Sequence, residues 1–308
     1  MFGKRADGKL LKKIDPIIML TAYLMPMRCD AQVMMDFKVD FEVLTRYIAR
    51  KRDEGYQITF QELLIAAFVR TIAEIPEANR FIINKRIYSR NELTVAFTLL
   101  MDGSEGVNVE ENAVKCKFEP TDTIFDVAAR VSEAIRQNRT QEESGFTLTL
   151  ARFLARPFLA APLVGLIRLL DRYGLLPKVI LDASPFHTSL FVTNMASIGM
   201  PAVKHHIYNF GTTSMFFSIG MPERTVAIGP EGKAVRKRML PMGVVADERI
   251  CAGAVYARVV SGIMKCLNNP ELMETPAQNV RYEEGNEYHL PVPKEKKKKQ
   301  SGQKALAE

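Results

Sequence analysis

The 308-residue chain contains no tryptophan and has only four cysteines and four histidines. The cysteines lie far apart, form no Cys-x-x-Cys pair and share no metal-ligand spacing with the histidines. This pattern argues against a metal site and predicts reduced thiols at Cys29, Cys116, Cys251 and Cys266. The chain also lacks a P-loop, a GxGxxG motif and a His-Glu-x-x-His motif, so none of the sites that these motifs form is indicated.

Long hydrophobic runs are absent as well. No segment approaches the 18 or so uncharged apolar residues that a membrane span needs. The basic start and the apolar run from Ile17 to Met27 are similar to a signal peptide. However, Asp15, Pro16 and Pro26 interrupt the pattern, and no small-residue cleavage site follows it. We therefore expect a soluble, cytoplasmic protein.

The positive charge is unevenly distributed along the chain. The net charge is +7, and residues 294–308 contribute six lysines against only Glu295 and Glu308. The rest of the chain is nearly balanced, so the sequence gives no sign of specific nucleic-acid binding. We expect a basic lead over residues 1–14, one domain over 15–275, and a polar, Lys-rich disordered tail over 276–308.

Hydrophobic periodicity predicts an α+β fold with a mixed sheet flanked by helices. Thr59 and Glu62 form a capping box at the start of one predicted helix. The predicted helices are 41–53, 59–73, 121–137 and 253–267. The predicted strands are 30–41, 80–83, 86–88, 93–100, 114–118, 189–194, 214–219, 224–228 and 237–246, whereas residues 1–15 are expected to be loop-like.

The segment from about 146 to 181 departs from this pattern because it is rich in leucine and arginine. We expect Pro157, Pro162 and Pro177 to break it into short helices. One interpretation is that these helices cover the sheet or a subunit contact, and the alternative is a basic amphipathic patch on an anionic membrane. The first is favoured, with the insert mostly packed against its own fold, because soluble proteins avoid large exposed apolar patches.

The C-terminal part carries a strand, then Asp-Glu-Arg-Ile-Cys-Ala-Gly-Ala over residues 247–254, then a helix followed by Asn-Asn-Pro-Glu-Leu272. This order resembles the end of the catalytic domain of the 2-oxo acid dehydrogenase dihydrolipoyl acyltransferases, which belong to the chloramphenicol acetyltransferase-like family. Upstream, residues 191–199 are similar to that family's Ser-Asn-Leu-Gly stretch. The resemblance covers roughly residues 15–275. It implies a two-layer fold and a homotrimer with active sites between subunits.

The resemblance also implies a set of site residues. Catalysis in the family needs a base, a hydroxyl that stabilises the oxyanion, and an Asp that fixes the loop. The base position is Glu248, where the family has His, and the Asp position is Ala252. Thr193 is the candidate hydroxyl, and the candidate substrate-binding residues are Asn194, Arg249 and Gly253.

A second candidate base lies in the segment His205-His206-Ile-Tyr-Asn-Phe-Gly211, which is similar to the family's doubled-His motif. Because this loop follows Thr193, we expect His206 to be an alternative base and His205 a substrate-binding residue. Hydrogen-bonded structural histidines are the alternative.

The implied function is an acyltransferase-like protein that transfers an acyl group from an acyl-CoA or acyl-thiol to an unknown acceptor. No covalently bound cofactor is expected, and coenzyme A or acyl-CoA is the expected substrate. Loss of both the family's His and its Asp favours the alternative, a catalytically inactive relative that acts as a ligand-binding or scaffold protein. The expected partners are the acyl donor and two further copies of the chain, and peripheral membrane contact is the less favoured alternative.

Overall fold

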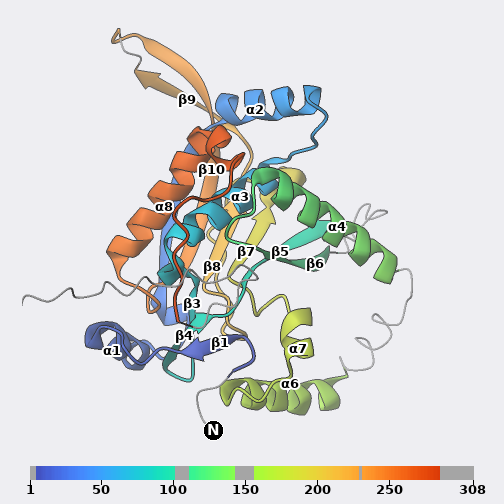
Figure 1. Cartoon of the computed structure of the whole chain (residues 1–308), viewed down its shortest axis with the longest axis vertical. Coiled ribbons are helices and arrows are strands. Elements are labelled where there is room, and N and C mark those ends of the chain that lie inside the picture. Colours follow the sequence, from blue (N-terminus) through green and yellow to red (C-terminus); the bar gives the residue numbers. More distant parts are fainter. Residues whose placement is uncertain (1–4, 101–110, 143–155, 229–230, 285–308) are drawn as a thin grey trace, which may run out of the picture.

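A computed structural model describes residues 5–100, 111–142, 156–228 and 231–284 (Figure 1). Within these residues, seven strands form the main sheet in the order β2-β10-β8-β7-β5-β6, with β9 paired to β10. Strand β7 runs parallel to β5 and β8, and the other pairs are antiparallel, so the sheet is mixed as predicted. The strands are β2 (Gln32–Asp40), β5 (Leu93–Leu100), β6 (Glu111–Phe118), β7 (Leu190–Asn194), β8 (Met215–Ile219), β9 (Glu223–Ile228) and β10 (Ala234–Asp247).

Helix α3 (Phe60–Glu74) packs between two other helices, α4 (Ile124–Glu142) and α8 (Gly253–Asn268). Because its interior is apolar on almost every side, α3 is buried over most of its length. The predicted capping box is confirmed, since the Thr59 amide donates to Glu62 Oε2 at 2.7 Å and the Glu62 amide donates to Thr59 Oγ1 at 3.3 Å. Helix α2 (Phe41–Asp53) contacts β10 and α8.

The two faces of the main sheet carry different cores. Alternating residues such as Phe217 and Val192 join the large core under the helices. Their strand neighbours Phe216 and Phe191 point the other way and form a small cluster with Ala96, Ile207 and Val245. The segment from 201 to 210 lies over this second face, because its residue Ile207 belongs to the cluster.

The N-terminal part differs from its prediction. Residues expected to be loop-like include β1 (Gly8–Leu10), which pairs with β4 (Arg86–Arg90), which in turn pairs with β3 (Arg80–Ile83). Strand β1 was missed because three residues are too few to show the alternation of apolar and polar side chains from which a strand is predicted. The apolar run forms α1 (Pro16–Leu24). Asp15 and Pro16, which interrupt a signal-peptide pattern, are here the N-cap and first residue of that helix.

The insert contains α6 (Pro157–Arg172) and α7 (Lys178–Ala183), while residues 146–155 lie outside the described part. Pro162 does not break α6 as predicted. A proline has no N–H group, so the carbonyl of Phe158, four residues earlier, lacks its helical hydrogen-bond donor. The turn that carries Phe158 is open to solvent, with that side chain 80% exposed, so water can supply the missing hydrogen bond. The prediction that the insert packs mostly against the fold is also wrong, because the apolar residues of α6 are largely exposed. No helix among the described residues is long and apolar enough to cross a membrane.

Part of the predicted disordered tail is ordered against the body. After the short helix Pro270–Met273, the chain continues to residue 284 without regular secondary structure. The amide of Arg281 donates to the Ala73 carbonyl at 2.8 Å, and Arg80 Nε donates to Glu283 Oε1 at 2.8 Å. The segment is held by polar contacts and has no hydrophobic periodicity, so the sequence pattern gave no sign of its order. The Lys-rich remainder, 285–308, lies outside the described residues.

Candidate active site

Glu248 lies directly after β10, where the chain turns before α8. Its backbone amide donates to the Ala31 carbonyl at 2.9 Å, and its side chain is exposed. The carboxylate makes no hydrogen bond or ion pair with any residue that the structure describes. It borders a cavity of about 500 Å³ whose lining is mainly apolar and includes Ile18, Met25 and Met35. Glu248 therefore stands at the mouth of an apolar cavity with its carboxylate free.

The preceding residue, Asp247, fixes this loop. It is fully buried and accepts hydrogen bonds from Arg249 at 2.8 and 2.7 Å and from Arg28 Nε at 3.3 Å. Arg28 also donates to the carbonyls of Tyr208 at 2.6 Å and Ile82 at 3.1 Å. Burial lowers the pKa of the Arg28 guanidinium, with Asp247 opposing and Arg249 adding to that effect. Asp247 thus connects the turn at Glu248 to Arg28 and, through Arg28, to the segments that carry Ile82 and Tyr208.

This arrangement bears on three of the predicted site residues. The position that corresponds to the family's loop-fixing Asp is occupied by Ala252, which is the N-cap of α8 and makes no side-chain cap hydrogen bond. Arg249 is buried, and its guanidinium is held by Asp247 and by the Met25 carbonyl at 2.8 Å, so it serves the loop. Gly253 begins α8, and an added Cβ would touch nothing there. Substrate contact by Arg249 or Gly253 stays a prediction.

Thr193 and Asn194 end strand β7 and line a second cavity, of about 210 Å³, with Gln61, Thr98 and Ser197. Thr193 Oγ1 lies 3.4 Å from Thr98 Oγ1 and 3.7 Å from Met195 Sδ. The Oδ1 atom of Asn194 is buried and accepts no hydrogen bond from the described residues. The structure therefore brings Thr193 and Asn194 together, with a hydroxyl and an unused acceptor in one small cavity.

His205 and His206 lie in the segment that crosses the second face of the sheet. The His205 ring stacks on Phe216 at 4.4 Å and on His206 at 4.5 Å between centroids. His205 Nδ1 lies 2.7 Å from the His206 carbonyl oxygen, and the His206 ring meets Tyr208 edge-on at 5.1 Å. These contacts support the structural interpretation for His205, whereas His206 is exposed.

One chain does not bring the two parts of the predicted site together. Thr193 lies level with Ser218 on β8, and Ser218 lies level with Gly243 on β10. Glu248 follows Gly243 by five residues, so it lies about 17 Å from the level of Thr193, measured along the strand direction. Strands β7 and β10 are two strand spacings apart, which adds a separation of about 10 Å across the sheet. Glu248 and Thr193 therefore line different cavities at opposite ends of the sheet.

Sequence reasoning missed the pair Arg28 and Asp247. A signal was available, because Asp247, Glu248 and Arg249 are three consecutive charges after an apolar strand, and buried charges need partners. The partner, Arg28, is more than two hundred residues away in sequence, and no local pattern links the two. Among the described residues, no group of three or more His, Cys, Asp and Glu side chains is placed to hold a metal ion.

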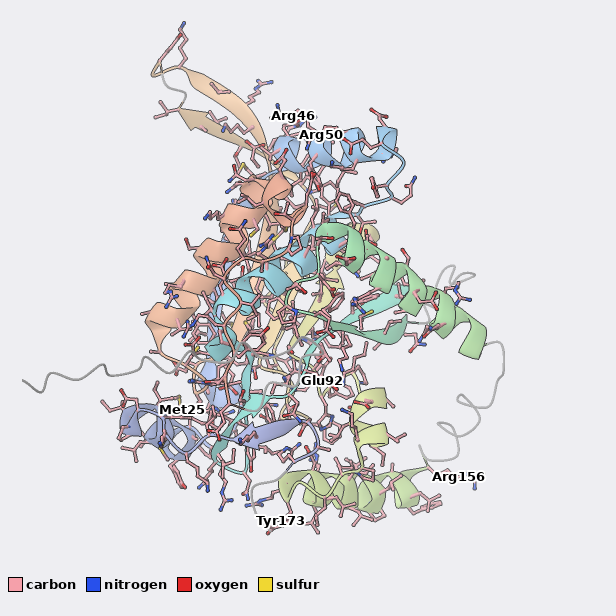
Figure 2. All side chains as sticks on the ribbon, viewed as in Figure 1. Met25, Arg46, Arg50, Glu92, Arg156 and Tyr173 are labelled. Atoms are coloured by element: carbon pink, nitrogen blue, oxygen red, sulfur yellow. The ribbon has the colours of Figure 1, made fainter. Side chains whose placement is uncertain are left out.

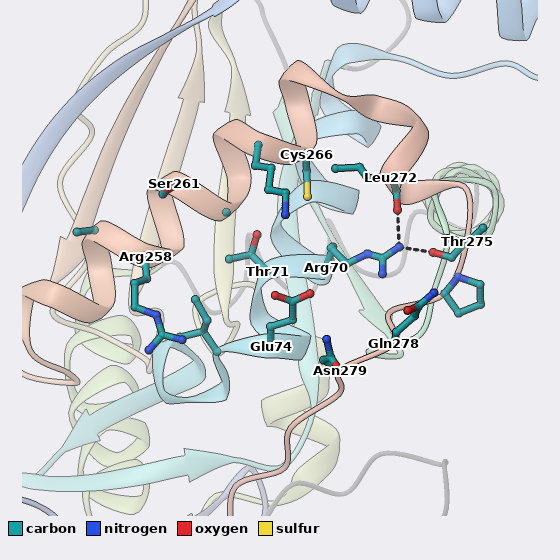
Figure 3. A pocket seen from close by; sticks show the side chains of 15 residues that line it. Arg70, Thr71, Glu74, Arg258, Ser261, Cys266, Leu272, Thr275, Gln278 and Asn279 are labelled. Atoms are coloured by element: carbon teal, nitrogen blue, oxygen red, sulfur yellow. Dashed lines mark hydrogen bonds between the residues drawn. The ribbon is translucent and has the colours of Figure 1, made fainter.

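A larger cavity, of about 680 Å³, lies between α3, α8 and the segment that follows α8 (Figure 3). Arg70 closes one side by donating to the carbonyls of Leu272, at 2.5 Å, and Thr275. None of the predicted site residues lines it. It is therefore a groove separate from the candidate site.

Neither a protein-family model nor a curated protein matches this sequence. Solved structures that are similar over most of the chain include the following three. The probable dihydrolipoamide acetyltransferase from Listeria monocytogenes 4b F2365 is 15% identical with a TM-score of 0.52, over 83% of this chain and 93% of that one. The cubic core of a pyruvate dehydrogenase multienzyme complex is 12% identical with a TM-score of 0.54, over 85% and 93%.

The dihydrolipoamide acetyltransferase from Azotobacter vinelandii is 13% identical with a TM-score of 0.53, over 85% of this chain and 93% of that one. In that enzyme a serine, a histidine and an asparagine have been investigated for roles in the catalytic mechanism. At identities this low, the structural similarity establishes the fold alone. The chemistry has to be argued from the residues of this chain. The chain has the chloramphenicol acetyltransferase-like fold of the 2-oxo acid dehydrogenase acyltransferase catalytic domains, as the sequence resemblance predicted.

Proposed function

We propose that the chain is an acyltransferase-like protein that binds an acyl-CoA or acyl-thiol at sites formed between the subunits of a homotrimer. The observation that carries the proposal is the division of the candidate site. Glu248 and Thr193 line separate cavities at opposite ends of one sheet. Juxtaposing these ends from neighbouring subunits would assemble a base, an oxyanion hydroxyl and an apolar channel.

Each half of the site has a chemical role in this arrangement. The Thr193 hydroxyl would donate a hydrogen bond to the developing oxyanion, and Asn194 Oδ1, which is buried without a partner, would accept one from the substrate. The apolar cavity beside Glu248 would receive the chain of the acyl-thiol. A carboxylate that a neighbouring subunit covers from water becomes a stronger base, which is what proton removal from an acceptor thiol or hydroxyl needs.

A thiol-release assay with a panel of acyl-CoAs tests the roles of the residues. We expect Glu248→Gln to lower turnover by about 10²–10⁴-fold as a lost general base. Thr193→Val should lower it by about 10²–10³-fold as a lost oxyanion donor. His206→Ala is the comparison that identifies the alternative base, and equal turnover in all variants would remove all three assignments.

Mixing two inactive variants tests the division between subunits. Glu248→Gln and Thr193→Val chains are unfolded together in equal amounts and refolded into shared trimers. If each site takes Glu248 from one subunit and Thr193 from the next, random assembly restores about one quarter of the wild-type sites. If one chain supplied both residues, no activity would return. Light scattering of the wild type should give the mass of three chains.

A second function is favoured by one observation, the replacement of the family's His and Asp by an exposed Glu248 and by Ala252. Under this alternative the chain binds an acyl-CoA without turning it over and acts as a ligand-binding or scaffold protein. Calorimetry with coenzyme A and acyl-CoA separates the two. Binding without thiol release supports the alternative, and turnover above background rules it out.

A further inference from the structure

Helix α6 presents an apolar stripe to solvent. Phe158, Pro162, Leu166, Leu169 and Tyr173 recur at helical spacing, which places them on one side. Their exposure is high, with Phe158 at 80% and Leu166 and Leu169 at 52% each. In Figure 2, Arg156 and Tyr173 mark the two ends of this segment, which runs along the edge of the molecule away from the main sheet. We call this side the α6 face.

The exposed charges of α6 itself are of one sign. They are Arg156 at its N-cap, Arg168 and Arg172, whereas the neighbouring α7 carries the exposed acid Asp182 and Lys178, which pairs with Glu92 at 2.8 Å. The single acid of α6, Asp171, is buried and paired, with Oδ1 2.7 Å from Arg5 Nη2 and Oδ2 3.2 Å from His187 Nε2. Arg168 and Arg172 lie four residues apart on one flank of the stripe.

A basic cavity of about 550 Å³ opens beside this flank. Its lining includes Lys85, Arg168 and Arg172, and its one acid is the already paired Asp171. Arg172 Nε donates to Asn84 Oδ1 at 3.0 Å. Asn84 and Lys85 form a hairpin turn with φ values of 49° and 59°, a left-handed conformation that costs non-glycine residues energy. The turn places Lys85 in the lining of this cavity, where its ammonium lies 5.4 Å from the centre of the Tyr23 ring.

The positive charge beside the α6 face indicates what kind of partner can bind there. A second copy docking through a two-fold axis on this face would bring Arg168 and Arg172 against their own equivalents, which is repulsive. In a trimer the α6 face would meet a different face of the neighbour, and the oligomer mass after replacement of Phe158 and Leu169 decides that case. An anionic bilayer offers both features at once, apolar acyl chains for the stripe and phosphates for the flanking cations. Helix α6 is too short to span a bilayer, and it has the composition of a helix that lies in the interface.

We propose that the α6 face docks on an anionic phospholipid surface, with Phe158, Leu166 and Leu169 in the outer acyl region and a lipid phosphate in the cavity beside Arg168 and Arg172. The proposal is independent of the proposed acyl-transfer function. It reverses the sequence-based expectation of an insert packed against its own fold, because the exposure of α6 removes the reason for that expectation.

Vesicle co-sedimentation of the full chain tests it, with phosphatidylcholine vesicles compared with vesicles that also contain phosphatidylglycerol. We expect pelleting with the anionic vesicles only. Phe158→Gln/Leu169→Gln should lower the bound fraction at least about tenfold, and Arg168→Gln/Arg172→Gln should remove the preference for anionic lipid. The matched control is Val226→Gln/Ile228→Gln on β9, whose side chains are 71% and 83% exposed and which lies at the far end of the molecule (Figure 1).

Several results would overturn the proposal. They are no pelleting of the folded chain with anionic vesicles, equal pelleting of the α6 and β9 variants, or a drop in oligomer mass when Phe158 and Leu169 are replaced. A competition arm separates a lipid phosphate from a free one. Inorganic phosphate at millimolar concentration should release the protein from the vesicles more than chloride does at equal ionic strength, because it competes for the cavity. If the folded chain binds inorganic phosphate through Arg168 and Arg172 but does not pellet with anionic vesicles, the cavity binds free phosphate and lipid docking is wrong. Circular dichroism confirms that each variant is folded.

Discussion

Asp247 and Arg249 form a two-point ion pair, with Asp247 Oδ1 2.8 Å from Arg249 Nε and Oδ2 2.7 Å from Arg249 Nη2. Arg28 adds a third contact to the same carboxylate. We predict that Asp247→Asn lowers the free energy of unfolding by about 3–5 kcal/mol, because it leaves two buried guanidinium groups without a counter-charge. Urea unfolding followed by circular dichroism measures the change.

The matched control for this prediction is Asp36→Asn. Asp36 pairs with Lys204 at 2.5 Å, but the two side chains are 61% and 40% exposed. Exposed ion pairs contribute little, so a loss below about 1 kcal/mol is expected there. A similar loss for Asp36→Asn and Asp247→Asn would show that the loop before α8 does not depend on the buried pair.

Local patterns predicted most of the main sheet and its covering helices. Alternation in residues 30–41 anticipated β2, the strand predicted over 189–194 corresponds to β7, and the capping box at Thr59 located α3 within one residue. The start of α4 was misplaced at residue 121. The helix begins at Ile124, and Thr123 Oγ1 accepts a hydrogen bond from the Asp126 amide at 3.3 Å, a second capping pair that the sequence contained.

Asp171 is the buried anchor of α6, and its titration should control acid stability. Burial raises the pKa of Asp171, but the contacts with His187 and Arg5 outweigh it, so the net pKa is lowered. An acid with a lowered folded-state pKa stabilises the fold above its unfolded pKa, near 4, and loses that contribution as the pH falls through the folded value.

We therefore predict that Asp171→Asn destabilises the protein by roughly 3 kcal/mol at pH 7 and that the difference from wild type shrinks towards pH 3. Thermal unfolding measured across this pH range tests the prediction. Asp182→Asn, at an exposed acid on α7, is the control and should leave the pH dependence unchanged. A constant difference between Asp171→Asn and wild type at every pH would contradict the assignment.

The four cysteines should differ sharply in reactivity. Cys29 is exposed, whereas the other three are buried. Burial raises the pKa of Cys116 and Cys251 to about 12 and that of Cys266 to about 11, so few of these thiols ionise near neutral pH. We predict that Ellman's reagent modifies one thiol in the native protein and four after denaturation. Cys29→Ser should abolish the fast reaction, and a fast signal that survives this change would contradict the prediction.

The candidate site could be predicted only in part. Thr193 and Asn194 were found together because they are adjacent in sequence at the end of one strand, whereas Gln61 and Thr98, which complete their cavity, come from other elements. Lys85 and Arg172, by contrast, meet beside one cavity through a hairpin and an insert that no sequence pattern connects. Likewise, Arg249 pairs with Asp247 and leaves the adjacent carboxylate of Glu248 without a partner among the described residues. The sequence alone does not indicate which of these two neighbouring acids forms the ion pair.

Gly243 determines how closely the segment carrying His205 and His206 approaches the sheet. An added Cβ at Gly243 would lie 2.8 Å from Ser218 Oγ and closer still to the Val203 carbonyl. Ser218 Oγ also accepts a hydrogen bond from the Val203 amide at 3.0 Å, so this segment is pinned to β8 and cannot move without losing the bond. Position 243 therefore requires glycine, because no Cβ atom fits between β10 and this segment.

We predict that Gly243→Ala displaces residues 201–207, lowers the free energy of unfolding by about 1–3 kcal/mol, and separates the His205 ring from Phe216. Histidine ring signals in NMR spectra report the stacking, and urea unfolding reports the stability. Gly253→Ala is the control, because nothing lies within 4 Å of its added Cβ, and it should be neutral or stabilising by up to about 1 kcal/mol. If Gly243→Ala left the ring signals in place, the segment would be held by its own stacked aromatic residues, and the close approach to β10 would have no part in positioning His206.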